Sequence, residues 1–165
     1  MKLASLHPID YPWLVFLFAD PGVRKYLGGP LSAVDAGHRA IQLIIGNDGA
    51  GKVWAIRPQA GEAAAGLVWL SPHHHGEDME LSIMLLPEWQ GRGVARLAAE
   101  EALRIAFVED RLPKVVAETQ SANVSCRRLM EALGMGRVRV LERFGVEQSL
   151  YELTAEAWRE RRQNA

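Results

Sequence analysis

Apolar positions recur along the chain with two periods, about two residues in some segments and three to four in others, which predicts alternating strands and helices. The clearest example is residues 81–107. An apolar run of strand length, Leu81 to Leu86, is closed by Pro87, and apolar residues at helical spacing begin at Val94. Two glycines, Gly91 and Gly93, lie between them. This stretch therefore predicts a strand, a tight turn and a helix.

The same patterns predict elements along the remaining chain. Asp10 is expected to cap a helix over 13–19, and Ser32 or Asp35 to begin a second helix. Ser121 or Asn123 should cap a third helix that ends at Gly134. A charged helix is expected over 155–162. The expected strands cover residues 2–6, 53–56, 66–70, 79–86, 114–118, 136–144 and 147–153.

Two faces are expected for the strand at 79–86 if its side chains alternate regularly. This alternation places Glu80, Ser82 and Met84 on one face and the three residues Leu81, Ile83 and Leu85 on the other. A helix and then the apolar strand at 114–118 follow. A strand, a helix and a strand in this order form a crossover unit with a parallel pair, whereas 53–56 with 66–70 and 136–144 with 147–153 suit antiparallel hairpins.

Composition narrows the class of protein. The length of 165 residues fits a single domain, 1–165, and the formal net charge of −1 gives no sign of a nucleic-acid or membrane surface. The single cysteine, Cys126, excludes an internal disulfide framework and favours a reducing compartment. The apolar run at 13–18 is too short for a membrane span or a signal peptide. We expect a cytoplasmic protein, either a monomer or a homodimer.

The turn before the helix is a candidate anion site. The first turn of a helix leaves several N–H groups without carbonyl partners, and the helix dipole adds partial positive charge there. A phosphate fits such a site, and Arg92 would add a full positive charge. The alternative is a tight connection whose glycines serve only packing.

The spacing Gln90-x-x-Gly93-x-Ala95, after a strand and Leu-Leu-Pro-Glu-Trp, resembles the pyrophosphate-binding turn of the GNAT superfamily of acyl-CoA N-acyltransferases. The resemblance covers about residues 3–154 and is greatest to the branch of ribosomal-protein N-terminal acetyltransferases. It implies an α/β (α+β) fold with a mixed, mostly antiparallel sheet of six or seven strands, a splayed parallel pair and flanking helices. It implies acetyl-CoA as co-substrate and no metal. The implied cofactor-binding residues are Ile83, Leu85, Gln90, Gly91, Arg92, Gly93, Val94, Ala95 and Asn123. In the family the strand before the turn is bulged, and one of its N–H groups faces the thioester carbonyl.

A second signature of the family is an Asn that opens a helix ending in Gly-Phe. Asn123 matches that Asn, and Met135 replaces the Phe. The position where many relatives carry a general-acid Tyr is Met130, which has no proton to donate. A Ser three residues after the Asn is frequent in the ribosomal-protein branch, and here that position is Cys126. Cys126 either hydrogen-bonds the CoA sulfur or is a small buried residue, and Ser125 is an alternative donor.

Acyl transfer to an amine requires a neutral amine, so a base must accept its proton. Glu80 is the candidate, directly or through water, because it lies near the start of the strand that would hold the thioester. The alternative is a solvated or salt-bridged strand carboxylate. By resemblance, Tyr26 lies where the family shapes its substrate pocket, although ordinary packing also accounts for an aromatic residue there.

Two further motifs resemble binding sites but are better explained as ordinary loops. Residues 46–52 match the start of a nucleotide phosphate-binding loop, but Val53 replaces the Mg²⁺-binding hydroxyl, and a helix precedes the loop where one should follow. The run His73-His74-His75 is expected to be a solvated loop, because adjacent histidines point different ways and no Cys or acidic residue nearby has metal-site spacing.

The sequence thus predicts acetyl transfer from acetyl-CoA to a primary amine within a ternary complex. The acceptor is either a protein N-terminus or a small amine. A non-catalytic acyl-CoA-binding or sensing module is the alternative, since the usual general-acid Tyr is missing.

Overall fold

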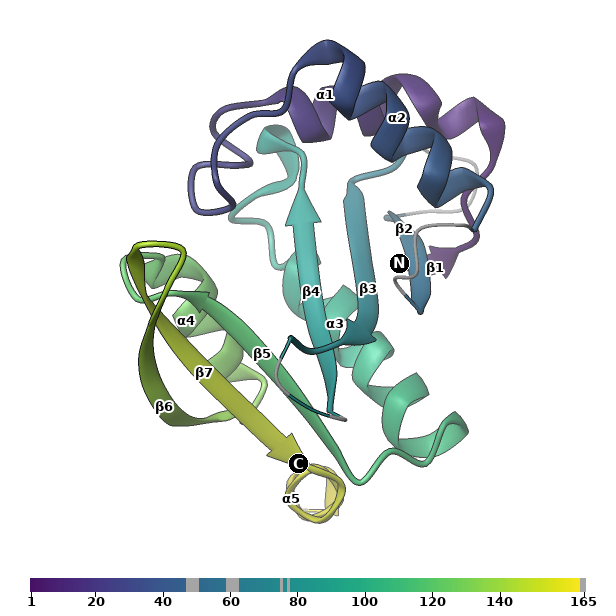
Figure 1. Cartoon of the computed structure of the whole chain (residues 1–165). Coiled ribbons are helices and arrows are strands. Elements are labelled where there is room, and N and C mark those ends of the chain that lie inside the picture. The colour runs from purple at the N-terminus through teal and green to yellow at the C-terminus, as the bar shows by residue number, and fades with distance from the viewer. Residues whose placement is uncertain (47–50, 59–62, 75, 77, 164–165) are drawn as a thin grey trace.

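The computed structural model describes residues 1–46, 51–58, 63–74, 76 and 78–163. Within these residues, seven strands form one sheet in the order β1-β2-β3-β4-β5-β7-β6 (Figure 1). The strands are β1 (Lys2–Ala4), β2 (Lys52–Arg57), β3 (Gly66–Pro72), β4 (Met79–Leu85), β5 (Lys114–Gln120), β6 (Gly136–Arg143) and β7 (Val146–Thr154). The helices are α1 (Tyr11–Ala19), α2 (Ala33–Ile44), α3 (Val94–Arg104), α4 (Val124–Ala132) and α5 (Ala155–Gln163). The mixed, mostly antiparallel sheet confirms the predicted fold class.

One pair of neighbouring strands, β4 and β5, is parallel. Their register joins Met79 to Val115 and Glu80 to Val116 and then ends, so the two strands diverge beyond Glu80 (Figure 1). The splayed pair is thus confirmed. The expected bulge in β4 is not present, because its pairing with β3 runs without a register shift from Pro72–Met79 to Gly66–Leu85.

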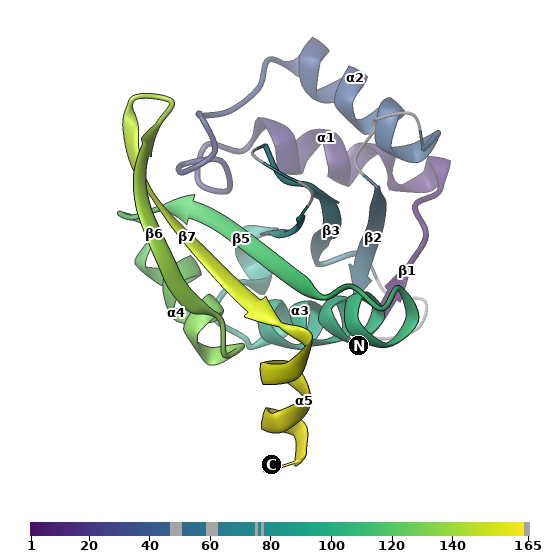
Figure 2. The ribbon, with the colours of Figure 1, turned by 60° about the horizontal axis from the view of Figure 1, so that its bottom comes forward.

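Helices cover both faces of the sheet, with α1 and α2 on one face and α3 and α4 on the other (Figure 2). Two apolar clusters follow this division. Leu81, Ile83 and Leu85 contact the cluster of α3 and α4, whereas Met84 belongs to the cluster of α1 and α2. The alternation predicted for this strand is therefore confirmed, and Glu80 lies on the same face as Met84.

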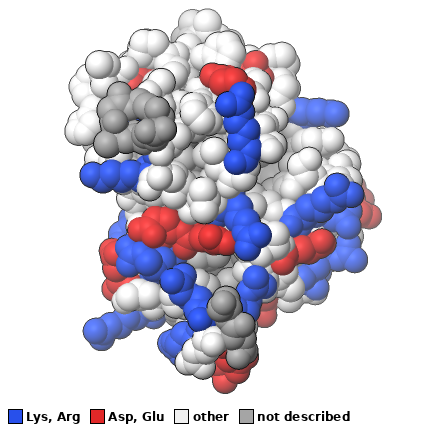
Figure 3. Space-filling view, turned by 180° about the vertical axis from the view of Figure 1, so that it is seen from behind, with Lys and Arg blue, Asp and Glu red and all other residues white. Residues whose placement is uncertain are grey.

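The buried side of α3 is formed by small and apolar residues such as Ala98 and Ala102. Its outer surface carries charged residues that form pairs. Arg96 pairs with Glu100 at 2.8 Å, and Arg104 with Glu101 at 2.9 Å. Seen from behind, Lys and Arg are interleaved with Asp and Glu in the lower half of the molecule (Figure 3). Pairs three or four residues apart on a helix add only a few tenths of a kcal/mol each.

The helix starts are only partly as expected. Ser32 caps α2 by accepting from the backbone N–H of Asp35 at 3.1 Å, which confirms that start. Asp10 stands at the N-cap position of α1 but makes no capping bond, so its predicted role is wrong. Its buried carboxylate instead accepts from the Trp13 indole at 2.8 Å and pairs with Arg57 of β2 at 2.6 Å. The Asp10 carboxylate is therefore used for an ion pair with a distant strand and not for capping the helix.

The C-terminal elements close the sheet. Strands β6 and β7 form the predicted hairpin, with Phe144 and Gly145 at its tip, and α5 follows β7 as expected. No helix in the part of the chain that the structure describes has the length and apolar character to cross a membrane.

Candidate active site

The turn between β4 and α3 is shaped by a side-chain bond and two unusual backbone conformations. Gln90 donates its side-chain amide to the carbonyl of Leu85 at 3.1 Å, which ties the turn to the end of β4. Gly91 and Gly93 have φ values of 72° and 77°, in the left-handed region that favours glycine. A Cβ added at either position would meet no atom within 4 Å. The glycines are therefore required by the backbone conformation, and the space beside the turn is open.

The N-terminus of α3 is uncapped by any side chain, because its N-cap residue is Gly93. The first helical hydrogen bond runs from the N–H of Leu97 to the carbonyl of Gly93, at 3.2 Å. The amides of the three preceding residues are the unpaired donors of a helix start. Exposed Arg92 lies beside them, with its guanidinium 5.6 Å from the Trp89 ring centroid. This set of donors fits a diphosphate group.

The divergence of β4 and β5 begins at Glu80 and continues to the end of β4 that leads into this turn. Beyond Glu80, the register of β4 has partners on β3 but none on β5 among the described residues. Ile83 and Leu85, the predicted cofactor contacts, lie in this splayed part of β4. We call this region, in which β4 has no register pairs with β5 between Glu80 and the uncapped end of α3, the opening.

Glu80 has an environment that alters its acid–base behaviour. Burial raises the pKa of its carboxyl above the usual value, and the negative charge of Glu118 adds to this effect. The charges of His73 and His74 and the backbone N–H of Glu118 act in the opposite direction without cancelling it. A raised pKa makes a carboxylate a stronger base, which suits the acceptance of an amine proton.

Three residues that the sequence analysis did not assign to the site are connected to Glu80: the charges of His73 and Glu118 act on its carboxyl, and Arg143 pairs with Glu118. His73 is 8% exposed, and its Nε2 lies 2.8 Å from Oε2 of Glu118. The Nε of Arg143 lies 2.8 Å from the other oxygen, an ion-pair distance at which the N–H is not aligned for a hydrogen bond. The expectation of a solvated histidine loop is therefore wrong for His73; His75 lies outside the described residues. Among the described residues, no three His, Cys, Asp or Glu side chains are grouped to hold a metal.

The second predicted signature lies at the start of α4. Asn123 caps the helix by accepting from the backbone N–H of Cys126 at 3.2 Å. Burial raises the pKa of the Cys126 thiol, and the side chain of Thr119 opposes this only in part. Cys126 packs against the core cluster of α3 and α4, and Met130 is 2% exposed within it. Cys126 is thus a partly buried thiol whose pKa is raised by its surroundings.

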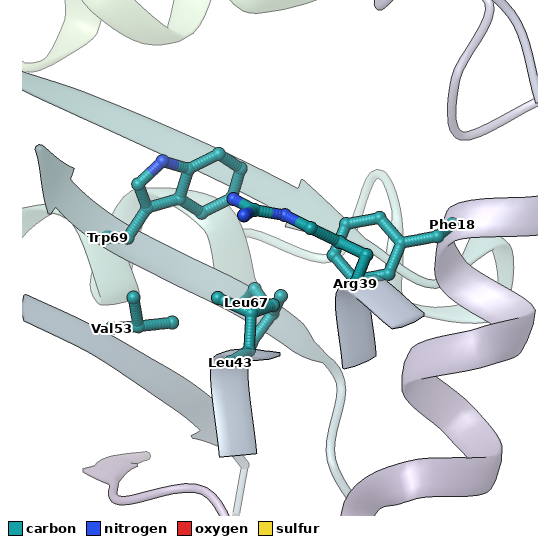
Figure 4. A pocket seen from close by; sticks show the side chains of 6 residues that line it. All are labelled: Phe18, Arg39, Leu43, Val53, Leu67 and Trp69. Carbon is teal, nitrogen blue, oxygen red and sulfur yellow. The ribbon is translucent and has the colours of Figure 1, made fainter. Parts of the chain in front are cut away.

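A small, mostly apolar recess lies on the face of the sheet that α1 and α2 cover. Its lining residues are Phe18, Arg39, Leu43, Val53, Leu67 and Trp69. The Arg39 side chain extends from α2 towards the side on which Trp69 lies (Figure 4). Trp69 is paired in register with Ser82 of β4, one strand away from the opening. Tyr26 lies half-buried in the turn between α1 and α2, with the Lys25 ammonium 5.2 Å from its ring centroid.

The structure agrees with the interpretation of residues 46–52 as a connecting loop, which the sequence analysis preferred to a nucleotide phosphate-binding loop. Residues 47–50 lie outside the described residues, but α2 precedes them and β2 begins at Lys52 directly after. A phosphate loop of that type requires a helix start after the loop, so the order of elements is the reverse of the required one.

Comparison with known proteins defines the class. The model of the acetyltransferase (GNAT) domain family matches residues 1–136. The chain therefore belongs to this family of acetyltransferases, whose members use acetyl-CoA. The match does not reach the finer assignment to the ribosomal-protein branch, which stays a prediction.

Solved structures show the same fold. An acetyltransferase of the GNAT family from Bacillus anthracis superimposes with a TM-score of 0.81 at 19% identity, covering 93% of this chain and 94% of its own. Spermidine N-acetyltransferase from Vibrio cholerae, in complex with CoA and spermine, also has a TM-score of 0.81, at 21% identity, with 95% and 96% covered. An acetyltransferase from Agrobacterium tumefaciens gives 0.77 at 21%, with 92% and 88% covered. At such identities the likeness establishes the fold.

Proposed function

We propose that this protein transfers the acetyl group of acetyl-CoA to a primary amine within a ternary complex, with Glu80 as the base. The observation that carries the proposal is the position of Glu80. It is the last residue of β4 paired with β5, and its carboxyl has a raised pKa where the two strands part. The uncapped N-terminus of α3 lies at the other end of the same opening.

The residues of the turn have a binding role in this proposal. The free amides at the start of α3, together with Arg92, hold the diphosphate of the co-substrate, and Gln90 keeps the turn in place. Asn123 and the splayed residues Ile83 and Leu85 line the path to the reacting carbonyl. When bound, acetyl-CoA supplies the activated thioester. The chain's contribution is to align amine and carbonyl and to exclude water from the opening.

Glu80 has the chemical role. An ammonium ion gives one proton to its carboxylate, directly or through water, and the neutral nitrogen then attacks the thioester carbon. A C–N bond forms and the C–S bond breaks, the nitrogen gives its second proton to water to become the amide, and CoA leaves as the thiolate. Met130 occupies the position of the family's usual general acid and has no proton to donate, while the Tyr151 hydroxyl donates to Glu131 at 3.3 Å. The leaving sulfur therefore takes its proton from water or from the Cys126 thiol.

The acceptor is proposed as a small amine or a protein N-terminus. The fold likeness to a spermidine N-acetyltransferase supports a small amine as the acceptor in general terms. It does not assign spermidine itself to this protein. A screen should therefore include spermidine, free amino acids and short peptides with Ala or Ser at the N-terminus. Release of CoA thiol, and the acetylated product by mass spectrometry, identify the acceptor.

The decisive variant is Glu80→Gln, with Glu152→Gln as the matched control. Glu152 is a carboxylate on β7, paired with Lys114 at 3.5 Å and separated from β4 by strand β5. Glu80→Gln should lower kcat about 10²- to 10³-fold, the usual contribution of a general base, while acetyl-CoA binds within about twofold of the wild type. The control should keep full activity. If the wild type binds acetyl-CoA but no amine releases thiol, the protein is a non-catalytic acyl-CoA-binding module. If Glu80→Gln keeps full kcat, Glu80 is not the base.

A further inference from the structure

Glu118 joins two segments that are far apart in the chain. It lies on β5, two residues beyond the last register pair with β4, where the opening begins. One carboxylate oxygen pairs with His73 in the β3–β4 connection, and the other with Arg143 at the end of β6. Its side chain is only 7% exposed. Each of the two carboxylate oxygens of Glu118 therefore has a partner from a different segment of the chain.

From these contacts we infer that Glu118 is a positioning residue, which fixes the β3–β4 connection and the β6–β7 hairpin over the acceptor side of the opening beside Glu80. This inference rests on the proposed function of Glu80. The clasp formed by His73, Glu118 and Arg143 sets the shape of the entrance through which the amine reaches that base.

A second contact joins the same two segments without Glu118. The rings of His74 and Phe144 meet edge to face, with centroids 6.1 Å apart, and His74 also contacts His73 at 6.0 Å. Phe144 is 79% exposed at the hairpin tip and has a φ of 55°, which is strained for an aromatic residue. The hairpin tip therefore adopts an unfavourable conformation at the point where it touches the β3–β4 connection.

The clasp also explains how two carboxylates occur side by side. Two unpaired carboxylates in a buried site repel one another, and each is costly to desolvate. His73 and Arg143 flank Glu118 and stabilise its negative charge. Glu80 has no such ion pair among the described contacts, and burial raises the pKa of its carboxyl. Its surroundings also include His74, whose charge acts on it.

Amide hydrogen exchange tests the clasp without an acceptor. In this protein, Glu118→Gln should speed exchange about tenfold or more in two peptides at once, one ending at His74 and one spanning Arg143 to Val146. A hydrogen bond to a charged group, in the first, and a buried ion pair, in the second, each contribute that much to local stability. Glu152→Gln should leave both peptides unchanged. Unchanged exchange in either peptide of Glu118→Gln, or equal changes in the control, would overturn the inference.

Arg143→Gln provides a second variant, because Arg143 lies near the hairpin tip and its loss leaves the core clusters intact. It should speed exchange in the hairpin peptide and, to a smaller extent, in the peptide ending at His74. Acetyl-CoA titration confirms that both variants are folded. An effect confined to the hairpin would show that the two segments are not coupled through Glu118.

Kinetics separate positioning from catalysis, with the amine found in the screen as the probe. Glu118→Gln should raise the KM for that amine about tenfold and change kcat less than about threefold, with unchanged affinity for acetyl-CoA. The acidic limb of the rate profile should also move to lower pH, because the negative charge next to Glu80 is removed. An unaltered KM and pH profile would refute the positioning role. Failure of all amines to react would instead refute the proposed function, and the exchange experiment would still decide whether the clasp exists.

Discussion

The side-chain amide of Gln90 donates to the carbonyl of Leu85, 3.1 Å away, and thereby holds the turn before α3 against the end of the splayed strand. This bond crosses from the proposed diphosphate site to the strand that borders the proposed thioester site. A single side chain thus sets the position of one site relative to the other.

Replacing Gln90 with Ala should weaken acetyl-CoA binding roughly 3- to 10-fold, which corresponds to the loss of one hydrogen bond worth about 0.5–1.5 kcal/mol. Isothermal titration calorimetry measures the change. The matched control is Gln42→Ala, since Gln42 is exposed on α2, and this variant should bind as the wild type does. Unchanged affinity in Gln90→Ala would show that the turn keeps its shape without the bond.

Replacing Gly93 with Ala should destabilise the protein by about 1–2 kcal/mol, because its φ of 77° is unfavourable for any residue with a Cβ. The new methyl group meets no atom within 4 Å, so the cost is in the backbone alone. The Tm should fall by roughly 2–8 °C. Gly136→Ala is the control, because Gly136 also has open space but no positive φ. An equal loss in both variants would contradict the backbone explanation.

The stability of Glu80→Gln relative to the wild type should increase with pH. The pKa of Glu80 is raised in the folded protein, so its favourable contribution is complete below the unfolded value and is lost as pH rises through the folded one. Gln does not titrate and escapes this loss. Urea unfolding between about pH 4 and about pH 8 measures the difference in free energy. A Gln advantage that is largest at acid pH would mean that the pKa is lowered instead.

Asp10→Asn should destabilise the protein by about 3 kcal/mol at neutral pH, because it breaks a buried ion pair with Arg57. Burial by itself would raise the pKa of Asp10, but bonds from Trp13, His7 and Arg57 outweigh it, and the pKa is lowered. Its contribution is therefore present above the unfolded pKa and is lost as pH falls through the folded one.

Urea unfolding at several pH values tests this, with Asp35→Asn, an exposed carboxylate in the first turn of α2, as the control. The Asp10 variant should approach the wild type in stability only at strongly acid pH. A loss no larger than that of the control would show that the Asp10–Arg57 pair contributes little.

The order of elements and the turn before α3 were predictable because they depend on local patterns. Apolar alternation determines the faces of β4, and two glycines next to an apolar helix indicate the turn. Asp10 and His73 were misjudged because their partners are distant in sequence: Arg57 is 47 residues from Asp10, and Glu118 is 45 residues from His73. No local pattern encodes such a pairing. The run of three histidines was the only signal for the clasp, and its acidic partner lay on another strand.

The short pairing of β4 and β5 has a mechanical consequence. Two register pairs join these strands, whereas β3–β4 and β5–β7 have seven each. Backbone pairing therefore joins β1–β4 to β5–β7 only weakly, and heat or force should separate these two parts of the sheet at β4–β5 before it disrupts the pairing within either part. A molecule bound between β4 and β5 would contact both parts, so binding there should also make the whole sheet more rigid.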